Sequence, residues 1–591
     1  MKQNPVIYAI ICILFVLSLP GYADDGDASA VDYLRKPVVP DVKGSPQEKY
    51  PLRWIYCGVN FQVDESVDSL IGTMKEAKGI GYNGVVITDY KFGRIKDRSD
   101  EYYRNLERTK QAADEMDIEI IPVVMSPSIL INDPSMVEGI PVKDCRFVVK
   151  DGRAVIRDTE NLLPGGDFER MADGNNFEGW NWIDGPGKSS FRDTEVKYSG
   201  ESAVRMENFR EGNEYGNCRI NKELTLRPWT QYHVRVVIKT QDVSPAQDLK
   251  IALLAAEGRS LNHRDLGVRD TQDWTEYNIT FNSLDNEIVR LYLGIWSGNR
   301  GKIWIDDLSM TETAGVNLVR REGCPVKVTS KDGTVEYLEG KDFEKWVDPK
   351  SGNAPWPGSF EDYHTPPPIV LTENSRIKEG ETLLVSFYHT AIIYWGAVFP
   401  CLLNEDLFTY YREQILDLDK YLSPRKYFMA HDELRVAGWC ETCSKAGTVG
   451  KILAQHIKRC TDLIKSINPD ADILVWSDMF DPYHNASTYP YYLCATSFDG
   501  SWEGLDRSVI VVNWNGGKRD SSMPFFAQQG HRQVIAGYYD SPDVKTRLKQ
   551  WLDAADKVDG VAGVMYTTWR SNYSHMEVFY ESLNDYISGK Q

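Results

Sequence analysis

The chain lacks an excess of basic residues: its 67 Lys and Arg face 86 Asp and Glu, which gives a formal net charge of −19. Nucleic acids and anionic membranes reward clustered Lys and Arg, so this balance argues against both as partners. No apolar stretch after residue 19 is long enough to span a bilayer. The residues at the carboxyl ends of the predicted barrel strands include no Ser–His–Asp arrangement, phosphate-binding loop or three-histidine metal set. Any chemistry must therefore come from other residue types.

The first 23 residues have the pattern of a secretory signal. Lys2 supplies a positive start, an apolar run follows over 8–19, and small residues occupy positions 21 and 23. We expect cleavage near Ala23 and export to the periplasm or the extracellular space. No cysteine follows the run, so a lipid anchor is not expected. Residues 24–49 are polar, contain proline and are interpreted as a linker.

Ten cysteines are present, and nine remain once Cys12 leaves with the signal. An odd number in an oxidising compartment leaves at least one thiol unpaired. Cys440 and Cys443 form a CxxC motif. A metal site would need two further ligands at a suitable spacing, and none is evident in the sequence. We therefore expect a local disulfide or two buried thiols.

A chain of 591 residues is too long for one core, so two or three domains are expected. Short apolar runs at 53–60, 84–90 and 119–125 alternate with helical patterns, which predicts βαβ units and a parallel sheet. From about residue 161 the alternation gives way to β-type runs at 232–239, 250–255, 274–281, 288–294 and 302–310. These runs predict a β-sandwich over 159–313, followed by a further β-rich segment over 314–395.

The alternating pattern resumes over 396–591, with strands predicted at 426–433, 472–479, 509–514, 533–540 and 561–569. Three strands before the insertion and five after it make eight, the number that closes a parallel barrel. This count assigns residues 383–389 to the insertion. The predicted fold class is α/β: a (β/α)8 TIM barrel that begins over 50–130 and is interrupted after its third strand by an all-β jelly-roll sandwich and a further β-rich segment.

The carboxyl ends of barrel strands meet at one mouth, where active sites of such barrels lie. The residues at these predicted ends are acidic and aromatic: Asp89, Asp432, Glu433, Trp476, Asp478, Trp514, Tyr538, Tyr539, Asp540, Tyr566 and Trp569. Adjacent acids raise one another's pKa, and a carboxyl that stays protonated near neutral pH can act as a general acid. Asp432 and Glu433 therefore suit glycosidic bond cleavage. In the alternative interpretation, one acid caps the next helix or pairs with Arg435.

The order HDE at 431–433, WSD at 476–478, NW at 513–514, YYD at 538–540 and TTW at 567–569 resembles the family 20 glycoside hydrolases, the β-N-acetylhexosaminidases. The resemblance implies substrate-assisted retaining catalysis. In it, Glu433 is the general acid and base, and Asp432 orients the 2-acetamido group of the substrate. Tyr539 or Tyr538 would hydrogen-bond the acetamido carbonyl, and the three tryptophans would wall the sugar site.

Two alternatives stay open. In a two-carboxylate retaining glycosidase acting on another sugar, Glu433 would be the acid and base and Asp540 the nucleophile. In the second, the chain is a non-catalytic glycan-binding protein. All three hypotheses name an oligosaccharide or polysaccharide partner and require no cofactor for catalysis; the sequence does not indicate an oligomeric state.

The sequence NLLPGGDFE at 161–169 and the closing WIDD at 304–307 resemble carbohydrate-binding modules of families 4, 9 and 16. This resemblance implies a jelly-roll sandwich with a structural calcium ion near its first and last strands. Glu169 and Asp307 would be candidate ligands, because carboxylate oxygens suit calcium. The alternative is that both residues lie in surface turns.

Overall fold

The computed structural model describes residues 49–126, 133–172 and 176–590. The predicted signal over 1–23, Cys12 and the linker up to residue 48 lie outside the described residues. Within the described ranges, none of the helices combines the length and apolar character needed to cross a bilayer.

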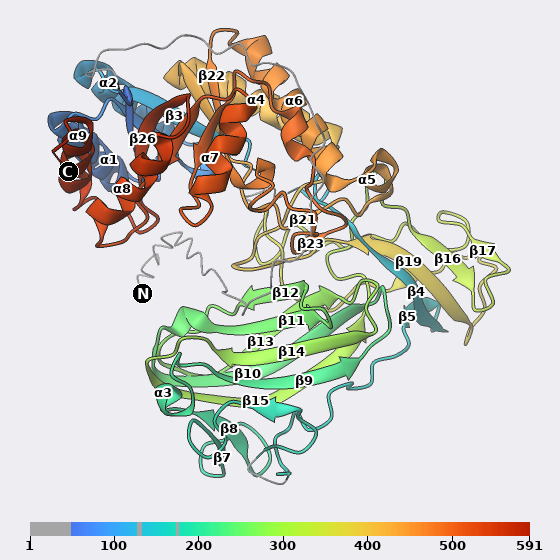
Figure 1. Ribbon diagram of the computed structural model, residues 1–591. Coiled ribbons are helices and arrows are strands. Elements are labelled where there is room, and N and C mark those ends of the chain that lie inside the picture. Colours follow the sequence, from blue (N-terminus) through green and yellow to red (C-terminus); the bar gives the residue numbers. More distant parts are fainter. Residues whose placement is uncertain (1–48, 127–132, 173–175, 591) are drawn as a thin grey trace.

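Eight parallel strands close a barrel near the top of Figure 1. In spatial order they are β1 (Leu52–Gly58), β2 (Gly84–Thr88), β3 (Glu119–Val124), β20 (Lys426–Met429), β22 (Asp472–Trp476), β24 (Ile510–Asn513), β25 (Gln533–Ala536) and β26 (Val561–Thr567). β3 pairs with β20 through Phe428 opposite Val123 and Met429 opposite Val124, so the barrel closes across some 300 residues of inserted chain. Three of its strands precede the insertion and five follow it.

Side chains that alternate along these strands fill the interior of the barrel. The interior includes Trp54, Val86, Ile121, Phe428, Leu474, Val512, Val534 and Met565. Gly84 has no side chain because Trp54 lies against it: a Cβ at Gly84 would come within 2.4 Å of the indole ring. This interior is a packed core and not a pore, so any site must lie at one end of the barrel.

Helices cover the outside of the barrel. They are α1 (Asp64–Ile80), α2 (Asp100–Met116), α4 (Glu405–Leu422), α5 (Glu441–Ala446), α6 (Val449–Ile467), α7 (Arg519–Gln528), α8 (Val544–Ala555) and α9 (Met576–Ile587), with the 3-10 helix η2 (Tyr90–Asp97) before α2. Their buried faces recur at helical spacing: α6, for example, buries Ile452, Leu453, Ile457 and Ile464.

Two five-stranded antiparallel sheets form a sandwich below the barrel in Figure 1. The first sheet is β13 (Gln272–Asn282), β10 (Gln231–Ser244), β15 (Arg300–Thr313), β8 (Ala203–Met206) and β7 (Ser190–Asp193). The second is β12 (Ser260–Asp265), β11 (Leu249–Ala255), β14 (Ile288–Ile295), β9 (Cys218–Thr225) and β6 (Trp182–Ile183). The short helices α3 (Phe209–Gly212) and η4 (Ala246–Asp248) lie between strands. All five β-type runs predicted from the sequence lie within these sheets.

A six-stranded antiparallel sheet lies beside the sandwich and takes strands from both sides of it in the sequence (Figure 1). Its order is β17 (Glu336–Tyr337), β16 (Lys327–Ser330), β19 (Thr382–His389), β4 (Ile140–Lys150), β5 (Arg153–Ile156) and β18 (Ile369–Val370). Because β19 pairs with β4, the sandwich is inserted into this sheet, and this sheet is inserted into the barrel. The assignment of residues 383–389 to the insertion is confirmed.

The predicted fold class, an α/β chain built as a (β/α)8 TIM barrel with one all-β interruption, is wrong. The antiparallel strands outnumber the eight barrel strands, and helices make up only 25% of the chain. The strand–helix repeat also fails between β22 and β24, where only η5 (Asp478–Phe480), β23 (Leu493–Cys494) and η6 (Ser501–Gly504) occur. The segment 481–492 contains two prolines and a run of polar and aromatic residues, which do not form a helix. The molecule is a closed parallel barrel combined with a larger antiparallel part.

Candidate active site

The predicted catalytic pair lies on the loop that follows β20. The strand ends at Met429, and His431 anchors the loop because its Nε2 lies 3.1 Å from Nε2 of His456 on α6. Burial lowers the pKa of His431, so its ring is neutral. Asp432 and Glu433 follow directly, and both side chains are partly exposed. The pair therefore reaches solvent at the carboxyl end of the barrel, where the sequence placed it.

Asp478, just after β22, fixes the position of Glu433. Its Oδ2 accepts a hydrogen bond of 2.9 Å from the backbone N–H of Glu433 and another of 2.9 Å from Nδ2 of Asn485. Its Oδ1 accepts from the indole Nε1 of Trp514 at 3.1 Å. Asp478 is completely buried, and both of its oxygens are in use. The predicted substrate-binding residue thus holds the loop and the tryptophan in place.

The backbone of Glu433 is in the left-handed region, with φ at +47°, which residues other than glycine rarely adopt. Such a conformation costs free energy and persists only where neighbouring contacts impose it, which is common at functional sites. The carboxylate of Glu433 accepts a 2.6 Å hydrogen bond from Nη2 of Arg435. The alternative interpretation of the sequence, in which one acid pairs with Arg435, is therefore confirmed for Glu433. The ion pair lies within the candidate site.

The three carboxyls differ in how they hold a proton. Burial, together with the charges of Asp478 and Glu433, raises the pKa of Asp432 to about 8. Burial also raises the pKa of Glu433, but Arg435 opposes that rise. Burial raises the pKa of Asp478, and its three hydrogen-bond donors oppose it. Arg435 lowers the pKa of Asp432 as well, but less than burial and the two neighbouring acids raise it, so Asp432 holds its proton at neutral pH.

Aromatic rings gather at the same end of the barrel as the acids. Trp476 belongs to the interior cluster of the barrel at its carboxyl end, and Trp514 and Trp569 are partly buried and pack against that cluster. Trp514 is nearly parallel to Tyr539, at a centroid distance of 6.4 Å, and Trp476 lies 6.1 Å from Trp569. Tyr56 lies between the last two, 6.1 Å from Trp476 and 5.4 Å from Trp569. The structure thus brings the three predicted tryptophans and Tyr539 together.

One buried donor in this aromatic group is unsatisfied. The indole Nε1 of Trp569 is buried and has no hydrogen-bond partner within the described part of the chain. Buried polar groups are almost always paired, so an unpaired donor at a partly exposed residue is a ready partner for a hydroxyl or carbonyl oxygen of a ligand.

Asp540, which the two-carboxylate hypothesis names as nucleophile, supports the turn after β26. Its Oδ1 accepts from Oγ1 of Thr568 at 2.6 Å, and its Oδ2 accepts from the backbone N–H of Trp569 at 2.6 Å. Both oxygens thus carry a short hydrogen bond. The placement makes Asp540 a support for the Trp569 ring.

The other predicted substrate-binding residues have partners elsewhere. Tyr538 stacks on Tyr566 at 4.1 Å and hydrogen-bonds His575 at 3.0 Å, while Tyr566 packs against Phe579 of α9. Asp89 caps η2 by accepting from the backbone N–H of Lys91, and it also accepts from that of Phe61. None of these contacts connects the three residues to the acidic pair.

The predicted calcium ligands also have protein partners. Both carboxylate oxygens of Glu169 lie 2.9 Å from the backbone N–H of Glu201. The carboxylate of Asp307 is paired with Nη1 of Arg235 at 2.6 Å. Neither residue belongs to a group of three or more candidate metal ligands among the described residues. The calcium site stays a prediction.

Sequence reasoning missed residues that complete the site. Tyr56 could have been found, because it alternates with Trp54 on β1 and so shares its inward face. Asn485 and Tyr492 lie in the irregular segment after β22, where no periodicity marks them. Tyr394 comes from the insertion: its ring lies 4.1 Å from the Arg435 guanidinium, and its hydroxyl lies 3.0 Å from that of Tyr492.

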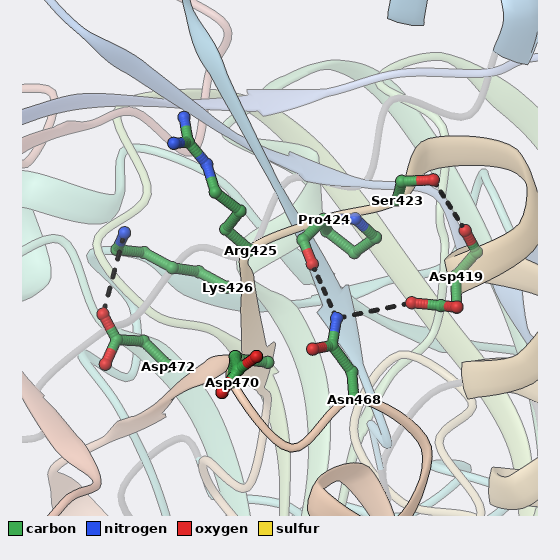
Figure 2. A pocket seen from close by; sticks show the side chains of 9 residues that line it. Asp419, Ser423, Pro424, Arg425, Lys426, Asn468, Asp470 and Asp472 are labelled. Atoms are coloured by element: carbon green, nitrogen blue, oxygen red, sulfur yellow. Dashed lines mark hydrogen bonds and ion pairs between the residues drawn. The ribbon is translucent and has the colours of Figure 1, made fainter.

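A hollow of about 410 Å³ lies at the opposite, amino-terminal end of β20 and β22 (Figure 2). Figure 2 shows the side chain of Asn468 directed to Asp419 and to the carbonyl of Pro424, and Lys426 directed to Asp472. Residues at this end of a barrel serve stability, because the strands direct their functional loops to the other end. The hollow is therefore not the candidate site.

No protein-family model matches the chain, and no curated protein sequence matches it. Similar solved structures include a CBM4 carbohydrate-binding module (17% identity over 26% of this chain and 99% of the module, TM-score 0.20). They also include the module TmCBM61 in complex with β-1,4-galactotriose (18% identity over 26% of this chain and 99% of the module, TM-score 0.20). A rhamnosidase from Novosphingobium sp. PP1Y is 10% identical over 92% of this chain and 59% of its own length, with a TM-score of 0.35. These likenesses are too low to assign a function, which must come from the residues at the barrel mouth.

Proposed function

We propose that this chain is an exported glycoside hydrolase that cleaves a glycan at the carboxyl mouth of the barrel, with Asp432 and Glu433 as its catalytic carboxyls. One observation carries the proposal: a carboxyl with a pKa raised to about 8 lies next to a second, arginine-paired carboxyl at a barrel mouth that also carries three tryptophans. Export rests on the predicted signal over 1–23.

The chemistry follows from this pairing. Cleavage of a glycosidic bond requires a proton for the leaving oxygen and negative charge near the anomeric carbon as it becomes oxocarbenium-like. A carboxyl with a pKa of about 8 is protonated at pH 7 and can donate. Arg435 lowers the pKa of Glu433 against the rise that burial causes, so Glu433 is our proposed ionised partner for the positive charge. Tryptophan faces suit the flat C–H faces of a sugar ring.

The division of labour differs from the one implied by the resemblance to family 20. There Glu433 donates the proton and Asp432 orients the 2-acetamido group. The protonation pattern favours Asp432 as the proton donor and Glu433 as the ionised partner. Because the two carboxyls interact, their protons are released in steps that belong to the pair and not to either residue alone. An N-acetylhexosaminide remains our proposed substrate, and its acetamido oxygen would be the nucleophile.

Asp540 is not our proposed nucleophile. Its two oxygens hold Thr568 and the backbone of Trp569 at 2.6 Å each, and attack on a sugar would break those hydrogen bonds. Substrate assistance requires no such carboxylate. A thiazoline inhibitor that mimics the oxazolinium intermediate should therefore inhibit strongly, whereas a covalent adduct trapped on Asp540 would contradict this mechanism.

A panel of aryl glycosides, including N-acetylhexosaminides, tests the proposal. Asp432→Asn should lose most activity on substrates with poor leaving groups and least on activated ones, because only the former need a proton donor. Glu433→Gln should lose activity on both. Asp481→Asn is the matched control, since burial raises the pKa of that nearby carboxyl to about 6. Glycan binding without hydrolysis of any substrate would favour the non-catalytic alternative.

A further inference from the structure

Four buried cysteines converge beside the candidate site. The Sγ of Cys401 lies 3.7 Å from Sγ of Cys440 and 3.5 Å from Sγ of Cys443. The thiol of Cys324 interacts with that of Cys440. All nine cysteines in the described part of the chain are buried and free, so the predicted local disulfide between Cys440 and Cys443 is wrong and the alternative of buried thiols is confirmed.

Two further cysteine sulfurs therefore lie beside the CxxC motif, although both are far from it in the sequence. Cys324 lies between β15 and β16, and Cys401 lies between β19 and α4. Neither is at a spacing that a motif search would recognise. The fold brings them to Cys440, the N-cap of α5, and to Cys443 in the first turn of that helix.

The separations fit a shared metal ion. Zinc binds thiolates at about 2.3 Å, and two sulfurs of a tetrahedral site are therefore about 3.8 Å apart. The sulfur–sulfur distances of 3.5 and 3.7 Å lie close to that value. The backbone N–H of Cys443 also points to Sγ of Cys440 at 3.5 Å, which stabilises a thiolate at that position.

The surroundings supply charge and close the site. The side chain of Arg321 is only 7% exposed, and its Nη2 forms an ion pair with Oε1 of Glu138 at 4.0 Å. This Nη2 has no hydrogen-bond partner among the described residues, so it can donate to a thiolate. A zinc ion with four thiolates carries two negative charges, which this cation offsets in part. Gly139 passes so close to Cys324 that a Cβ at that position would lie 2.7 Å from the sulfur.

Glu138 competes with Cys324 as the fourth ligand, because its carboxylate lies within 4.8 Å of the sulfurs of Cys401, Cys440 and Cys443 in a group that does not include Cys324. Its Oε2 also accepts from Sγ of Cys443 at 3.7 Å. However, its Oε1 accepts hydrogen bonds from the backbone N–H groups of Cys440 and Gly139 at 3.0 and 3.1 Å, and its Oε2 accepts from Gly438 at 3.3 Å. These contacts give Glu138 a positioning role in the loop and leave coordination to sulfur.

We propose that one structural zinc ion binds at this cluster, held by the thiolates of Cys324, Cys401, Cys440 and Cys443. Each thiol loses its proton to solvent as a Zn–S bond forms, and no oxidant is needed. Four protein ligands leave no open position, so the ion does not take part in catalysis. It would tie the loop after β20, a few residues beyond Glu433, to the two inserted segments.

The metal content of the purified full-length protein tests the proposal. We expect about one zinc per chain, by mass spectrometry of the metal, and its release when a mercurial titrates about four thiols. Cobalt substitution should give the intense absorption bands of a four-sulfur tetrahedral site. A disulfide between any two of these cysteines, a metal-free protein or iron in place of zinc would each overturn the proposal.

Variants test the ligand set. Cys324→Ser, Cys401→Ser and Cys443→Ser should each lower zinc content at least about tenfold, because serine is a poor zinc ligand. Cys218→Ser is the matched control: this buried thiol in the sandwich already contacts Ser190, and its loss should leave zinc unchanged. Glu138→Gln should retain zinc. Zinc kept in Cys324→Ser but lost in Glu138→Gln would refute the four-cysteine set, and the cobalt spectrum of the unmodified protein decides the matter if a variant fails to fold.

Discussion

Asp432 gives the most direct test of the site, because a raised pKa lowers the stability of the folded protein at neutral pH, and this loss can be measured. In the folded protein its pKa is raised to about 8 by burial and by the charges of Asp478 and Glu433, against 3.8 for a free side chain. Below pH 3.8 the carboxyl is protonated in both the folded and the unfolded state. Between these values the unfolded chain releases the proton and the folded chain keeps it, so stability falls as the pH rises.

The size of this cost follows from the difference in pKa. Each pH unit corresponds to about 1.4 kcal/mol, so the full difference would cost about 6 kcal/mol above pH 8. Because the side chain is partly exposed and shares its proton with neighbouring acids, roughly 3 kcal/mol is a more realistic value. Asp432→Asn removes the ionisable group and should therefore stabilise the protein, increasingly so from pH 5 to pH 9.

Thermal unfolding measured across that pH range provides the assay. The difference in melting temperature between Asp432→Asn and the unmodified protein should grow with pH. A change of roughly 3 kcal/mol in the free energy of unfolding corresponds to about a few degrees in total. Asp332→Asn is a suitable control. Hydrogen bonds from Ser330 and Thr334 lower the pKa of that exposed carboxyl to about 2, so its contribution is constant above pH 5. A difference for Asp432→Asn that does not change with pH would show that Asp432 is ionised and refute its role as acid.

Three further changes probe the support of the site. Arg435→Met removes the cation paired with Glu433 at 2.6 Å, so the pKa of Glu433 should rise and the acidic limb of the activity profile should move to higher pH; an unmoved limb would contradict the pairing. Trp514→Phe keeps an aromatic ring but removes a donor to buried Asp478, and should cost about 1–3 kcal/mol in the free energy of unfolding, measured in urea. Arg259→Ala removes two hydrogen bonds from the sandwich to the segment after β22 and should lower activity without removing either catalytic carboxyl, with Arg290→Ala on the same sandwich as control.

The sequence predicted the barrel strands because each is a short apolar run with no competing pattern. The predicted runs continued past the true ends: the run at 426–433 becomes a strand that ends at Met429. The overshoot did not harm the site prediction, because residues after a strand end lie on loops at the same mouth. It did hide the turn that gives Glu433 its left-handed conformation, which no periodicity marks.

The parts that the sequence did not predict depend on long-range contacts. Pairing of β4 with β19 joins residues more than 200 positions apart, and hydrophobic alternation identifies a strand without identifying its partner. Cys324 and Cys401 were missed for the same reason. Tyr538 and Tyr566 were placed at the mouth by their position along the chain. Tyr566 on β26 and Tyr538, two residues after β25, instead belong to the core cluster that includes Phe579 of α9.

The insertion is connected to the candidate catalytic residue Glu433 by a series of direct contacts. Arg259, at the edge of the sandwich, donates to the backbone carbonyls of Tyr492 and Cys494 at 3.0 and 2.7 Å. Tyr492 and Tyr394 flank the guanidinium of Arg435, which holds the carboxylate of Glu433. Because Arg435 opposes the rise that burial causes in the pKa of Glu433, contacts from the sandwich reach the cation that acts on this carboxyl. The insertion therefore acts as part of the barrel mouth, and removing it would leave Glu433 without the packing that holds its cation.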